Sequence, residues 1–426
     1  MKFYSTNQQS PVVDFKTGVI KSLPADNGLY FPESIPDISD FLAQPDLSLQ
    51  EIAFETLKPF CVPDIPEARL RTIVEDTFSF DIPVKSVAAN ILALELFHGP
   101  TYAFKDVGAR FLARCLGYFN ETDQKEVTIL VATSGDTGGA VASGFYQVPG
   151  VQVVILYPSG KVSDLQEKQL TTLGSNIRAL EVAGTFDDCQ QLVKQAFLDE
   201  KLNGQINLSS ANSINIARWI PQSIYYSWAC QQLKDQEHLV FSIPSGNYGN
   251  LAAGMLAHQM GANISRFIAA SNANDVVPRY LLSDLYEPKP TIATYSNAMD
   301  VGKPSNFPRM QALCNNDYQA MTELITGFSL NDEATLQAMR SCLSAHDYLT
   351  DPHGAIGYQG LKTHLQPGET GVFLETAHPC KFQDIITMVD THYQLPDFTR
   401  ELMQKSKTST QMSTSFEEFK EILLTN

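Results

Sequence analysis

Between residues 125 and 270 the chain alternates between short apolar runs and longer amphipathic segments, and this alternation limits the possible folds more than any other feature. Short runs rich in Val, Ile and Leu are typical of buried strands, whereas apolar residues every three or four positions are typical of helices. Strands and helices that alternate in this way form a parallel sheet covered by helices, so we predict an α/β protein. The expected strands are 127–132, 151–157, 177–182, 239–243 and 266–270, and the expected helices are 140–147, 165–173, 186–200 and 251–260.

The alternation stops near residue 200 and resumes at residue 239, which gives two separate αβ regions. Two such regions predict two lobes, each with a parallel sheet, and a cleft between them. Each region has a glycine-rich turn directly after an apolar strand, at residues 133–139 and 245–250. Ligands of parallel sheets bind beyond the carboxyl ends of the strands, so both turns are expected to face the cleft.

Both turns have the composition of an anion site. Glycine allows a tight bend, and the free N–H groups at the start of the following helix attract a negative charge. The alternative is a purely structural turn that an Asp or Thr side chain caps. The first turn contains Thr133, Ser134, Gly135, Asp136 and Thr137, and the second contains Ser245, Gly246, Asn247, Tyr248 and Gly249.

Lys105 is the candidate catalytic residue, because it lies among apolar and small residues directly before a helical pattern. An amine becomes a good nucleophile or base only when its surroundings lower its pKa. The ordinary lysine pKa of about 10.4 would have to fall by about three pH units to reach a useful value near 7 to 8. We expect burial beside Tyr102 and Phe104 to cause this fall. The alternative is a solvated surface lysine.

Residues 210–218 form a third candidate site, in which amide, hydroxyl and guanidinium side chains lie close together in the sequence. We expect Ser213 to cap a helix whose apolar side includes Ile216 and Ile220. Arg218 could then bind a phosphate group through two hydrogen bonds. The alternative is a helix cap followed by a solvated arginine.

The segment from His98 to Asp106 reads H-G-P-T-Y-A-F-K-D and resembles the lysine motif of fold-type II pyridoxal phosphate (PLP) enzymes, most closely that of the threonine synthases. The resemblance extends from about residue 28 to 382. It implies two parallel-sheet lobes with a central cleft, and an N-terminal domain that the shorter dehydratases lack. The expected domains are an N-terminal domain in 1–85, a large PLP-binding lobe in 86–120 and 205–426, and a small mobile αβ lobe in 121–204.

The resemblance also implies roles for individual residues. Lys105 would link the cofactor covalently and move protons during the reaction. Asp136 replaces the asparagine that usually lies beside the 3′ oxygen of the cofactor, so the hydrogen-bond partner of this oxygen stays open. Thr376, in the segment E-T-A-H-P, would face the pyridine nitrogen. The cofactor phosphate would bind Ser245, Gly246, Asn247, Tyr248 and Gly249. The substrate carboxylate would bind Thr133, Ser134, Gly135 and Thr137. The substrate phosphate would bind Asn212, Ser213 and Arg218.

The implied activity converts O-phospho-L-homoserine and water into L-threonine and phosphate, by γ-elimination and β-hydration. One alternative is a threonine or serine dehydratase of the same fold type, which would not need the phosphate site at Arg218. The other is a PLP-binding homologue without catalytic activity. Two readings of His378 stay open, a residue that supports the site from behind and a histidine packed in the core, and we favour packing. The sequence assigns no role to Lys161, to residues 297–300 or to residues 351–354.

The overall composition excludes several other classes of protein. Acidic residues exceed basic ones by 47 to 30, and the formal net charge of −17 disfavours nucleic acid and anionic membranes as partners. Seven scattered cysteines without a C-x-x-C pair argue against a disulfide framework and against a zinc site, so we predict no metal. No apolar run approaches the length of a membrane span, and we expect a cytoplasmic monomer or homodimer.

Overall fold

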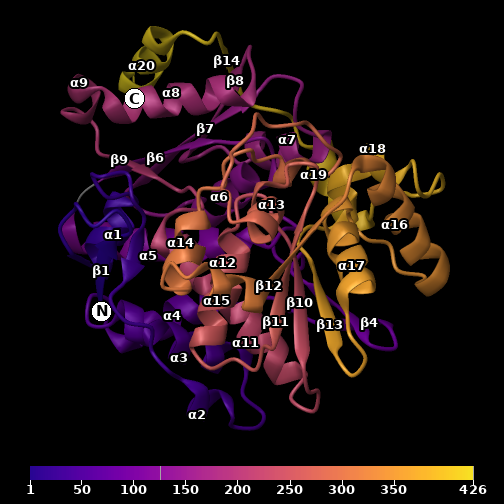
Figure 1. The fold of residues 1–426 in the computed structure, drawn as a ribbon. Coiled ribbons are helices and arrows are strands. Elements are labelled where there is room, and N and C mark those ends of the chain that lie inside the picture. Colours follow the sequence, from indigo (N-terminus) through magenta and orange to yellow (C-terminus); the bar gives the residue numbers. More distant parts are fainter. Residues whose placement is uncertain (125, 426) are drawn as a thin grey trace.

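The computed structural model describes residues 1–124 and 126–425, and it contains three sheets surrounded by helices (Figure 1). Two of the sheets are parallel or mostly parallel, which confirms the predicted α/β class. Within the described ranges, every helix is too short or too polar to cross a membrane.

The N-terminal segment has its own small antiparallel sheet, with the strand order β2-β1-β3. Helix α3 starts at a capping box, in which Ser48 and Glu51 bond to each other's backbone N–H groups. It packs against α11 of the large lobe, and α4 packs against α5. The elements of this segment are β1 (Lys2–Ser5), β2 (Val13–Asp14), α1 (Phe15–Lys21), β3 (Tyr30–Pro32), α2 (Ser39–Leu42), α3 (Leu49–Cys61) and α4 (Glu67–Thr77).

The large lobe is built on a six-stranded sheet with the order β12-β11-β10-β13-β5-β4. All neighbours are parallel except β4 and β5. Every residue of the inner strand β10 is buried, as expected for a strand covered on both faces. The strands are β4 (Val84–Ala88), β5 (Ile91–Glu95), β10 (Leu239–Pro244), β11 (Arg266–Ser271), β12 (Ile325–Ser329) and β13 (Thr370–Glu375).

Helices cover this sheet and connect its strands (Figure 1). Helix α17 packs along β10, β11 and β13, and α12 packs on α11 and α14. The helices are α5 (Lys105–Asp123), α10 (Ile216–Trp219), α11 (Ser223–Gln232), α12 (Gly249–Gln259), α13 (Val276–Ser283), α14 (Phe307–Leu313), α15 (Tyr318–Leu324), α16 (Asp332–His346), α17 (Pro352–His364), α18 (Gln383–Ile386) and α19 (Arg400–Gln404), with 3-10 turns η1 (Ile220–Gln222), η2 (Asn297–Met299), η3 (Pro379–Phe382) and η4 (Asp397–Thr399).

The small lobe is built on a parallel five-stranded sheet with the order β14-β8-β7-β6-β9. This sheet takes β9 and β14 from outside residues 121–204. Helix α20 packs on α8, and α19 packs on α7, so α19, β14 and α20 all contact the small lobe. The elements are β6 (Val127–Ala132), α6 (Asp136–Phe145), β7 (Val151–Pro158), α7 (Asp164–Thr171), β8 (Ile177–Val182), α8 (Phe186–Leu198), α9 (Glu200–Asn203), β9 (Leu208–Ser210), β14 (Thr410–Met412) and α20 (Phe416–Leu424).

The predicted strands 127–132 and 177–182 agree with β6 and β8. The helix that was predicted to start at residue 140 starts at Asp136 instead. Glycines in the sequence suggested a longer turn, but Gly138 and Gly139 lie in the first turns of α6. The helix therefore begins four residues closer to the end of β6, and its N-terminus lies in the turn itself.

Candidate active site

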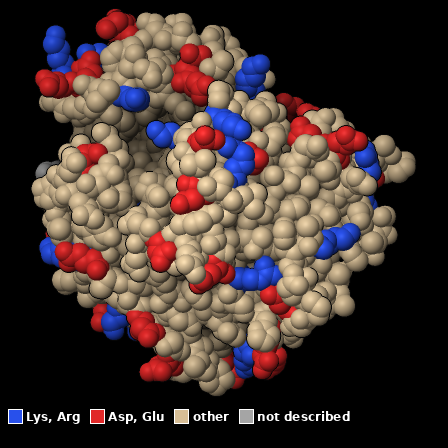
Figure 2. All heavy atoms as spheres, in the orientation of Figure 1, with Lys and Arg blue, Asp and Glu red and all other residues tan. Residues whose placement is uncertain are grey.

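A cavity of about 820 Å³ lies between the two parallel-sheet lobes, at the carboxyl ends of β6 and β10. Figure 2 shows a hollow between the small lobe at the top and the rest of the molecule. All but one of the residues that the sequence singled out for the site line the cavity, and Asn212 is the exception. The predicted residues in its wall are Lys105, Thr133, Ser134, Gly135, Asp136, Thr137, Ser213, Arg218, Ser245, Gly246, Asn247, Tyr248, Gly249 and Thr376.

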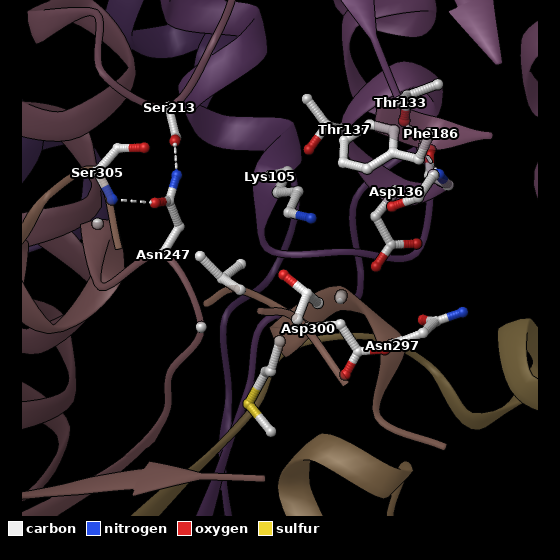
Figure 3. Close-up of a pocket in the computed structure, with 18 of the residues that line it drawn as sticks. Lys105, Thr133, Asp136, Thr137, Phe186, Ser213, Asn247, Asn297, Asp300 and Ser305 are labelled. Atoms are coloured by element: carbon white, nitrogen blue, oxygen red, sulfur yellow. Dashed lines mark hydrogen bonds between the residues drawn. The ribbon is translucent and has the colours of Figure 1, made fainter. Parts of the chain in front are cut away.

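Lys105 is the first residue of α5, and its side chain points into the cavity between Thr137 and Asn247 (Figure 3). Burial lowers the pKa of Lys105 to about 8; the charge of Asp136 raises it, and those of Arg218 and Lys381 lower it further. The predicted direction of this shift and its main cause are therefore confirmed. A substantial fraction of the amine is neutral at a pH near 8, so it can act as a nucleophile or a base.

The residues before Lys105 fix the start of its helix. The buried Asp106 carboxylate accepts hydrogen bonds from the backbone N–H of Thr101 at 2.9 Å and from its hydroxyl at 2.5 Å. A Cβ atom on Gly99 would lie 2.5 Å from an Asp106 oxygen, so only glycine fits there. The N–H of Phe104 donates to the Thr376 carbonyl at 2.9 Å. The H-G-P-T-Y-A-F-K-D segment thus fixes the start of α5 beside the Thr376 backbone, and with it the backbone position of Lys105.

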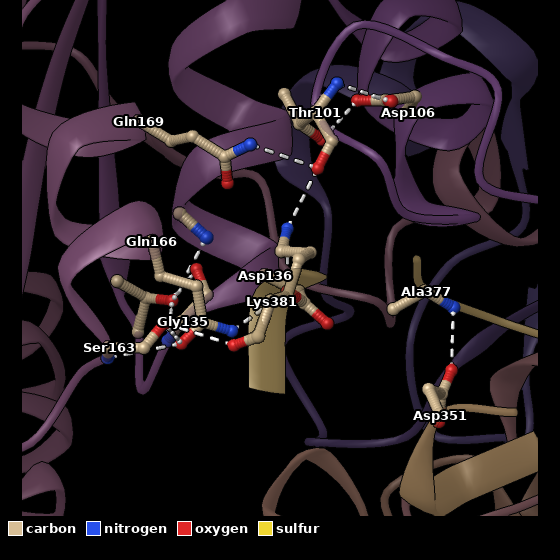
Figure 4. A network of polar contacts seen from close by, with 12 residues as sticks. Thr101, Asp106, Gly135, Asp136, Ser163, Gln166, Gln169, Asp351, Ala377 and Lys381 are labelled. Atoms are coloured by element: carbon tan, nitrogen blue, oxygen red, sulfur yellow. Dashed lines mark hydrogen bonds and ion pairs between the residues drawn. The ribbon is translucent and has the colours of Figure 1, made fainter. Parts of the chain in front are cut away.

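The first turn is held by its own threonine and by charge. The Thr133 hydroxyl accepts from the N–H groups of Gly135 at 3.0 Å and Gly138 at 2.9 Å. The Asp136 carboxylate accepts from Lys381 Nζ at 2.7 Å and from Gln166 Nε2 at 3.0 Å (Figure 4). Burial alone would raise the pKa of Asp136, but Lys381 and Lys105 hold it well below its usual range. Asp136 is therefore a carboxylate at neutral pH.

The second turn contains no charged side chain. A Cβ atom on Gly246 would lie 2.5 Å from Met299 Cα, so glycine is needed for the close approach of η2. Asn247 Nδ2 donates to Ser213 Oγ at 2.8 Å, and Asn247 Oδ1 accepts from the Ser305 N–H at 2.5 Å (Figure 3). Helix α12 begins at Gly249, so its free N–H groups lie in the wall of the cavity.

The segment before α10 differs in one respect from the prediction. Asn215, not Ser213, caps the helix, because its side-chain oxygen accepts from the Ala217 N–H at 2.9 Å. The Ser213 hydroxyl instead bonds to Asn247. Asn212 lies outside the cavity wall, and its N–H donates to Ser210 Oγ at 3.3 Å.

Arg218 is 2 % exposed, which rules out the alternative of a solvated arginine. Its Nη1 donates to the carbonyl of Ala211, while its Nε meets no hydrogen-bond acceptor in residues 1–124 or 126–425. Burial lowers the pKa of Arg218 to about 10, and the guanidinium keeps its charge at neutral pH. A buried guanidinium in the wall of a cavity is suited to bind an anion.

Thr376 follows β13 directly and lines the cavity. His378 caps η3 by accepting from the Cys380 N–H at 3.1 Å, and its ring packs against Phe97 and Phe398. Burial lowers the pKa of His378 to about 4, with a smaller effect of His98 in the same direction. His378 thus packs against aromatic rings, as predicted, but it is half-buried and lies at the edge of the core.

Several residues of this region were not among the predicted site residues. Lys381 lies five positions after Thr376, and this proximity was the only sequence signal for it. Asp300 lines the cavity and accepts from Thr294 Oγ1 at 2.7 Å and Asn272 Nδ2 at 2.9 Å. The other residues in the wall that were left without a role include Lys161, Gln166, Phe186, Asn297, Met299, Ser305 and His353.

Comparisons with known proteins agree with this geometry. Residues 80–376 match the family model described as pyridoxal-phosphate dependent enzyme. Residues 2–78 match the model of the threonine synthase N terminus, and residues 354–423 match that of the threonine synthase C-terminal part. The chain belongs to the threonine synthase family.

Relatives within this family match the chain over nearly its whole length. Threonine synthase from Haemophilus influenzae is 45% identical over 417 residues, which cover 94% of this chain and 97% of the relative. The crystal structure of threonine synthase from Escherichia coli superimposes with a TM-score of 0.91 at 42% identity, covering 100% of this chain and 99% of that one. The PLP-bound threonine synthase from Brucella melitensis has a TM-score of 0.94 at 35% identity, covering 99% and 98%.

Membership of this family establishes the fold-type II architecture and PLP as the cofactor. The residues in the cavity fit this cofactor. Lys105 offers an amine with a lowered pKa, the start of α12 offers backbone N–H groups, and Thr376 offers a hydroxyl on the same wall. The dehydratase alternative is not favoured, because the N-terminal and C-terminal family models both describe threonine synthases.

Proposed function

We propose that this chain converts O-phospho-L-homoserine and water into L-threonine and inorganic phosphate. The observation that carries the proposal is the buried Arg218, which lies in the wall of the same cavity as the Lys105 amine and the two turns. A substrate with a carboxylate, an amine and a phosphate needs two anion sites around one reactive group. A dehydratase substrate carries no phosphate and would leave Arg218 without a use.

Lys105 supplies the amine that links the cofactor and later moves protons at the substrate's α and β carbons. PLP, when bound, withdraws electrons from the carbon that carries the substrate's amino group. The lowered pKa of Lys105 allows its neutral form to accept a proton and its charged form to return one near neutral pH. Its place at the start of α5, bonded through Phe104 to Thr376, fixes the position of the amine.

The substrate carboxylate is assigned to the first turn, at Thr133, Ser134, Gly135 and Thr137. These residues surround the N-terminus of α6, where free N–H groups favour a negative charge. Asp136 would repel a carboxylate, but its ion pair with Lys381 offsets its charge. Asp136 then remains available to the 3′ oxygen of the cofactor, the position that it takes in the family pattern.

The cofactor phosphate is assigned to the second turn, at Ser245, Gly246, Asn247, Tyr248 and Gly249. Phosphate groups bind at helix N-termini through backbone N–H groups alone, and α12 provides such an end. Thr376 is assigned to the pyridine nitrogen, because it lies on the cavity wall next to the segment that positions Lys105.

The substrate phosphate is assigned to Arg218 and Ser213, with Asn212 as a further predicted contact. Ser213 is already bonded to Asn247 of the cofactor-phosphate turn, so the two phosphate groups would bind next to each other. Arg218 supplies the charge, and its burial strengthens the attraction, because water screens it less there. The leaving phosphate would thus be held while water adds at the β carbon.

We also propose a cellular location, a class of partner and possible oligomeric states for this chain. The seven cysteines are free thiols, in agreement with a reducing compartment, and we propose a cytoplasmic location. The partner is a small-molecule substrate, with neither nucleic acid nor membrane involved. One chain supplies all the proposed site residues, so a monomer and a homodimer are equally compatible with the site.

A coupled assay tests the proposed function. The PLP-loaded protein should release phosphate from O-phospho-L-homoserine with an equal amount of L-threonine. Ammonia release from L-threonine without phosphate turnover would support the dehydratase, and neither reaction in a protein that holds PLP would support the non-catalytic homologue. Arg218→Gln should lower kcat/KM for the phosphorylated substrate by about 10² to 10³-fold, because a buried charged hydrogen bond is lost.

A further inference from the structure

The N-terminal segment has no role in the proposed reaction, but it contacts the residues assigned to the substrate phosphate. Among the residues that the structure describes, those that line the cavity begin at Phe104, so the N-terminal segment supplies none. Helix α1 lies beside α5 and β9 (Figure 1), and it also contacts α10, whose third residue is Arg218. Residues 209–219, which contain Arg218 and Ser213, are called the phosphate segment below.

The C-terminal end of α1 binds the phosphate segment through two backbone carbonyls. The last turn of a helix leaves carbonyl groups without a partner inside the helix. The Val19 carbonyl accepts from Asn215 Nδ2 at 2.9 Å. The Ile20 carbonyl accepts from Ser209 Oγ, also at 2.9 Å. Side chains of the phosphate segment therefore provide the partners that the end of α1 lacks.

Asn215 joins this contact to the helix that carries Arg218. Its side chain is fully buried. While Nδ2 donates to the Val19 carbonyl, Oδ1 accepts from the Ala217 N–H at 2.9 Å and caps α10. One amide thus binds the end of α1 and the start of α10. Because Arg218 lies three residues after Asn215, the position of α1 determines where the helix with the guanidinium begins.

Strand β3 contacts the same short helix at both of its ends. The ring of Phe31 stacks on that of Trp219, the last residue of α10, with the centroids 5.7 Å apart. The fully buried Arg309 donates from Nη2 to the Tyr30 carbonyl at 3.2 Å and to the Ile214 carbonyl at 2.5 Å. The N-terminal segment therefore holds α10 by polar contacts and by packing.

Gly18 shows how closely α1 and α10 approach each other. A Cβ atom on Gly18 would lie 2.8 Å from Cδ1 of Ile216, the first residue of α10. Glycine destabilises the interior of a helix, and the close approach of α10 explains why α1 contains one.

We propose that the N-terminal segment, through Asn215, holds the phosphate segment in the conformation that binds the phosphate group of the substrate. Asn215 lies outside the cavity wall, so it is a positioning residue that acts through Arg218 and Ser213. The inference rests on the proposed function, because it needs a phosphate group bound at Arg218. A binding group keeps its affinity only when the residues behind it fix its position, so this support sets the strength of phosphate binding.

Titration calorimetry of the PLP-loaded protein with inorganic phosphate and with L-threonine tests this proposal. The cofactor then occupies the second turn, so added phosphate reports on the Arg218 site. Asn215→Ser keeps an oxygen that can cap α10, but its side chain is too short to reach Val19. It should raise the dissociation constant of phosphate by about tenfold and that of L-threonine by less than about twofold. PLP affinity should also stay within about twofold, because the second turn keeps its bonds to Ser305 and Asn306.

Gly18→Val changes the N-terminal segment itself and removes no polar group. The larger side chain forces Ile216 or α1 to move, so the dissociation constant of phosphate should rise by about three- to tenfold. L-threonine and PLP should bind as in wild type. This variant tests the proposal even if Asn215→Ser does not fold.

Asn176→Ser is the matched control. Asn176 is a buried asparagine outside the cavity wall, and its amide donates to the carbonyls of Phe145 at 2.8 Å and Val151 at 2.9 Å. Its loss should lower Tm at least as much as Asn215→Ser does, but it should leave the dissociation constant of phosphate unchanged. An equal rise in this control would show that lost stability, and not the support of the phosphate segment, weakens phosphate binding, and the proposal would fail.

Wild-type phosphate affinity in Gly18→Val and in folded Asn215→Ser would also overturn the proposal. Arg218→Gln separates this failure from a failure of the proposed function. If Arg218→Gln binds phosphate as wild type does, the substrate phosphate has been assigned to the wrong residues. If Arg218→Gln weakens phosphate binding while the other two variants do not, the assignment of the site stands and only the role of the N-terminal segment is wrong.

Discussion

The two glycine-rich turns of the cavity have similar sequences, but they are stabilised in different ways. The turn after β6 contains a buried carboxylate, Asp136, which forms an ion pair with Lys381 at 2.7 Å. The turn after β10 contains no charge and is held by hydrogen bonds of Asn247 to Ser213 and Ser305. Two turns of similar sequence can thus differ in how much stability a substitution removes. Loss of the partner of a buried charge lowers the free energy of unfolding far more than loss of the partner of a neutral amide.

The two turns also connect different parts of the chain. Through Lys381, the first turn binds the small lobe to the segment after β13 of the large lobe. The second turn reaches the N-terminal segment: Asn306 donates to the Asn247 carbonyl at 3.1 Å, and the buried Arg309 donates to Asn306 Oδ1 at 2.8 Å and to the Tyr30 carbonyl at 3.2 Å. We infer that the conformation of the first turn depends on the relative position of the two lobes. The second turn is supported by the N-terminal segment.

Lys105 lies between the two turns, and its loss should have the largest effect. Lys105→Ala should remove the visible absorbance band of the covalently bound cofactor and lower turnover by at least about 10⁴-fold, because the chain then lacks both the link and the base. Both quantities are measured on PLP-loaded protein. Lys85→Ala, which changes an exposed lysine on β4, is the control and should match wild type. If the absorbance band persists in Lys105→Ala, the assignment is wrong.

Removing the partner of the charged turn should have the next largest effect. Lys381→Met leaves Asp136 buried without its ammonium group, which should lower the free energy of unfolding by about 3 to 5 kcal/mol. The urea midpoint and Tm of the apoprotein measure this loss. The double variant Lys381→Met with Asp136→Asn should recover most of it, since Asn can still accept from Gln166. Equal losses in the single and double variants would show that the ion pair is not the cause.

The neutral turn should instead respond to shape. Gly246→Ala places a methyl group 2.5 Å from Met299 Cα, and the shift of η2 that this requires should cost about 1 to 3 kcal/mol. We expect this cost mainly as weaker PLP binding, measured by titration of the apoprotein. Gly204→Ala is the control, because a Cβ atom there would make an ordinary contact, 3.4 Å from the Glu200 carbonyl oxygen. Unchanged PLP affinity in Gly246→Ala would show that this turn is not the phosphate cradle.

The charge of the first turn should also affect the reactivity of Lys105. With a pKa of about 8, only about one tenth of the amine is neutral at pH 7, so covalent PLP binding should accelerate about tenfold as the pH rises and level off above about 9. Asp136 raises the pKa of Lys105, so Asp136→Asn should move the midpoint of this profile to lower pH. Stopped-flow absorbance at a series of pH values measures both profiles. A midpoint near 10 in wild type would contradict the buried position of the amine.

The features that the sequence predicted correctly are those that local patterns determine. Strands β6 and β8, the two turns and the position of Lys105 follow from apolar runs, glycines and short motifs, which act over a few neighbouring residues. Arg218 was also found this way, because it lies at helical spacing after polar residues with a clear chemistry.

The features that were missed depend on contacts between residues far apart in the chain. Asp136 and Lys381 are separated by 245 positions, and no local pattern shows that one needs the other. Strand β14 has only three residues, and it forms because the edge of β8 is available to pair with it. His353 could be recognised as a cavity residue only after α17 was placed beside β13. Sequence patterns therefore gave the parts of the site, but not the ion pair that connects its two lobes.

Asn247→Ala should have the smallest effect and gives the sharpest test of the difference between the turns. It removes the hydrogen bonds to Ser213 and Ser305, and the free energy lost with the two bonds should be about 1 to 2 kcal/mol in total. The loss is small because both partners are neutral and water in the cavity can replace the amide. We expect a rise of about five- to tenfold in KM for the phosphorylated substrate, since Ser213 loses its support, with little change in Tm. Asn90→Ala, at an exposed asparagine whose amide donates to the Glu369 carbonyl, is the control for a lost amide. If Asn247→Ala lowered Tm as much as Lys381→Met, the neutral turn would be as important for folding as the charged one, and the distinction between them would fail.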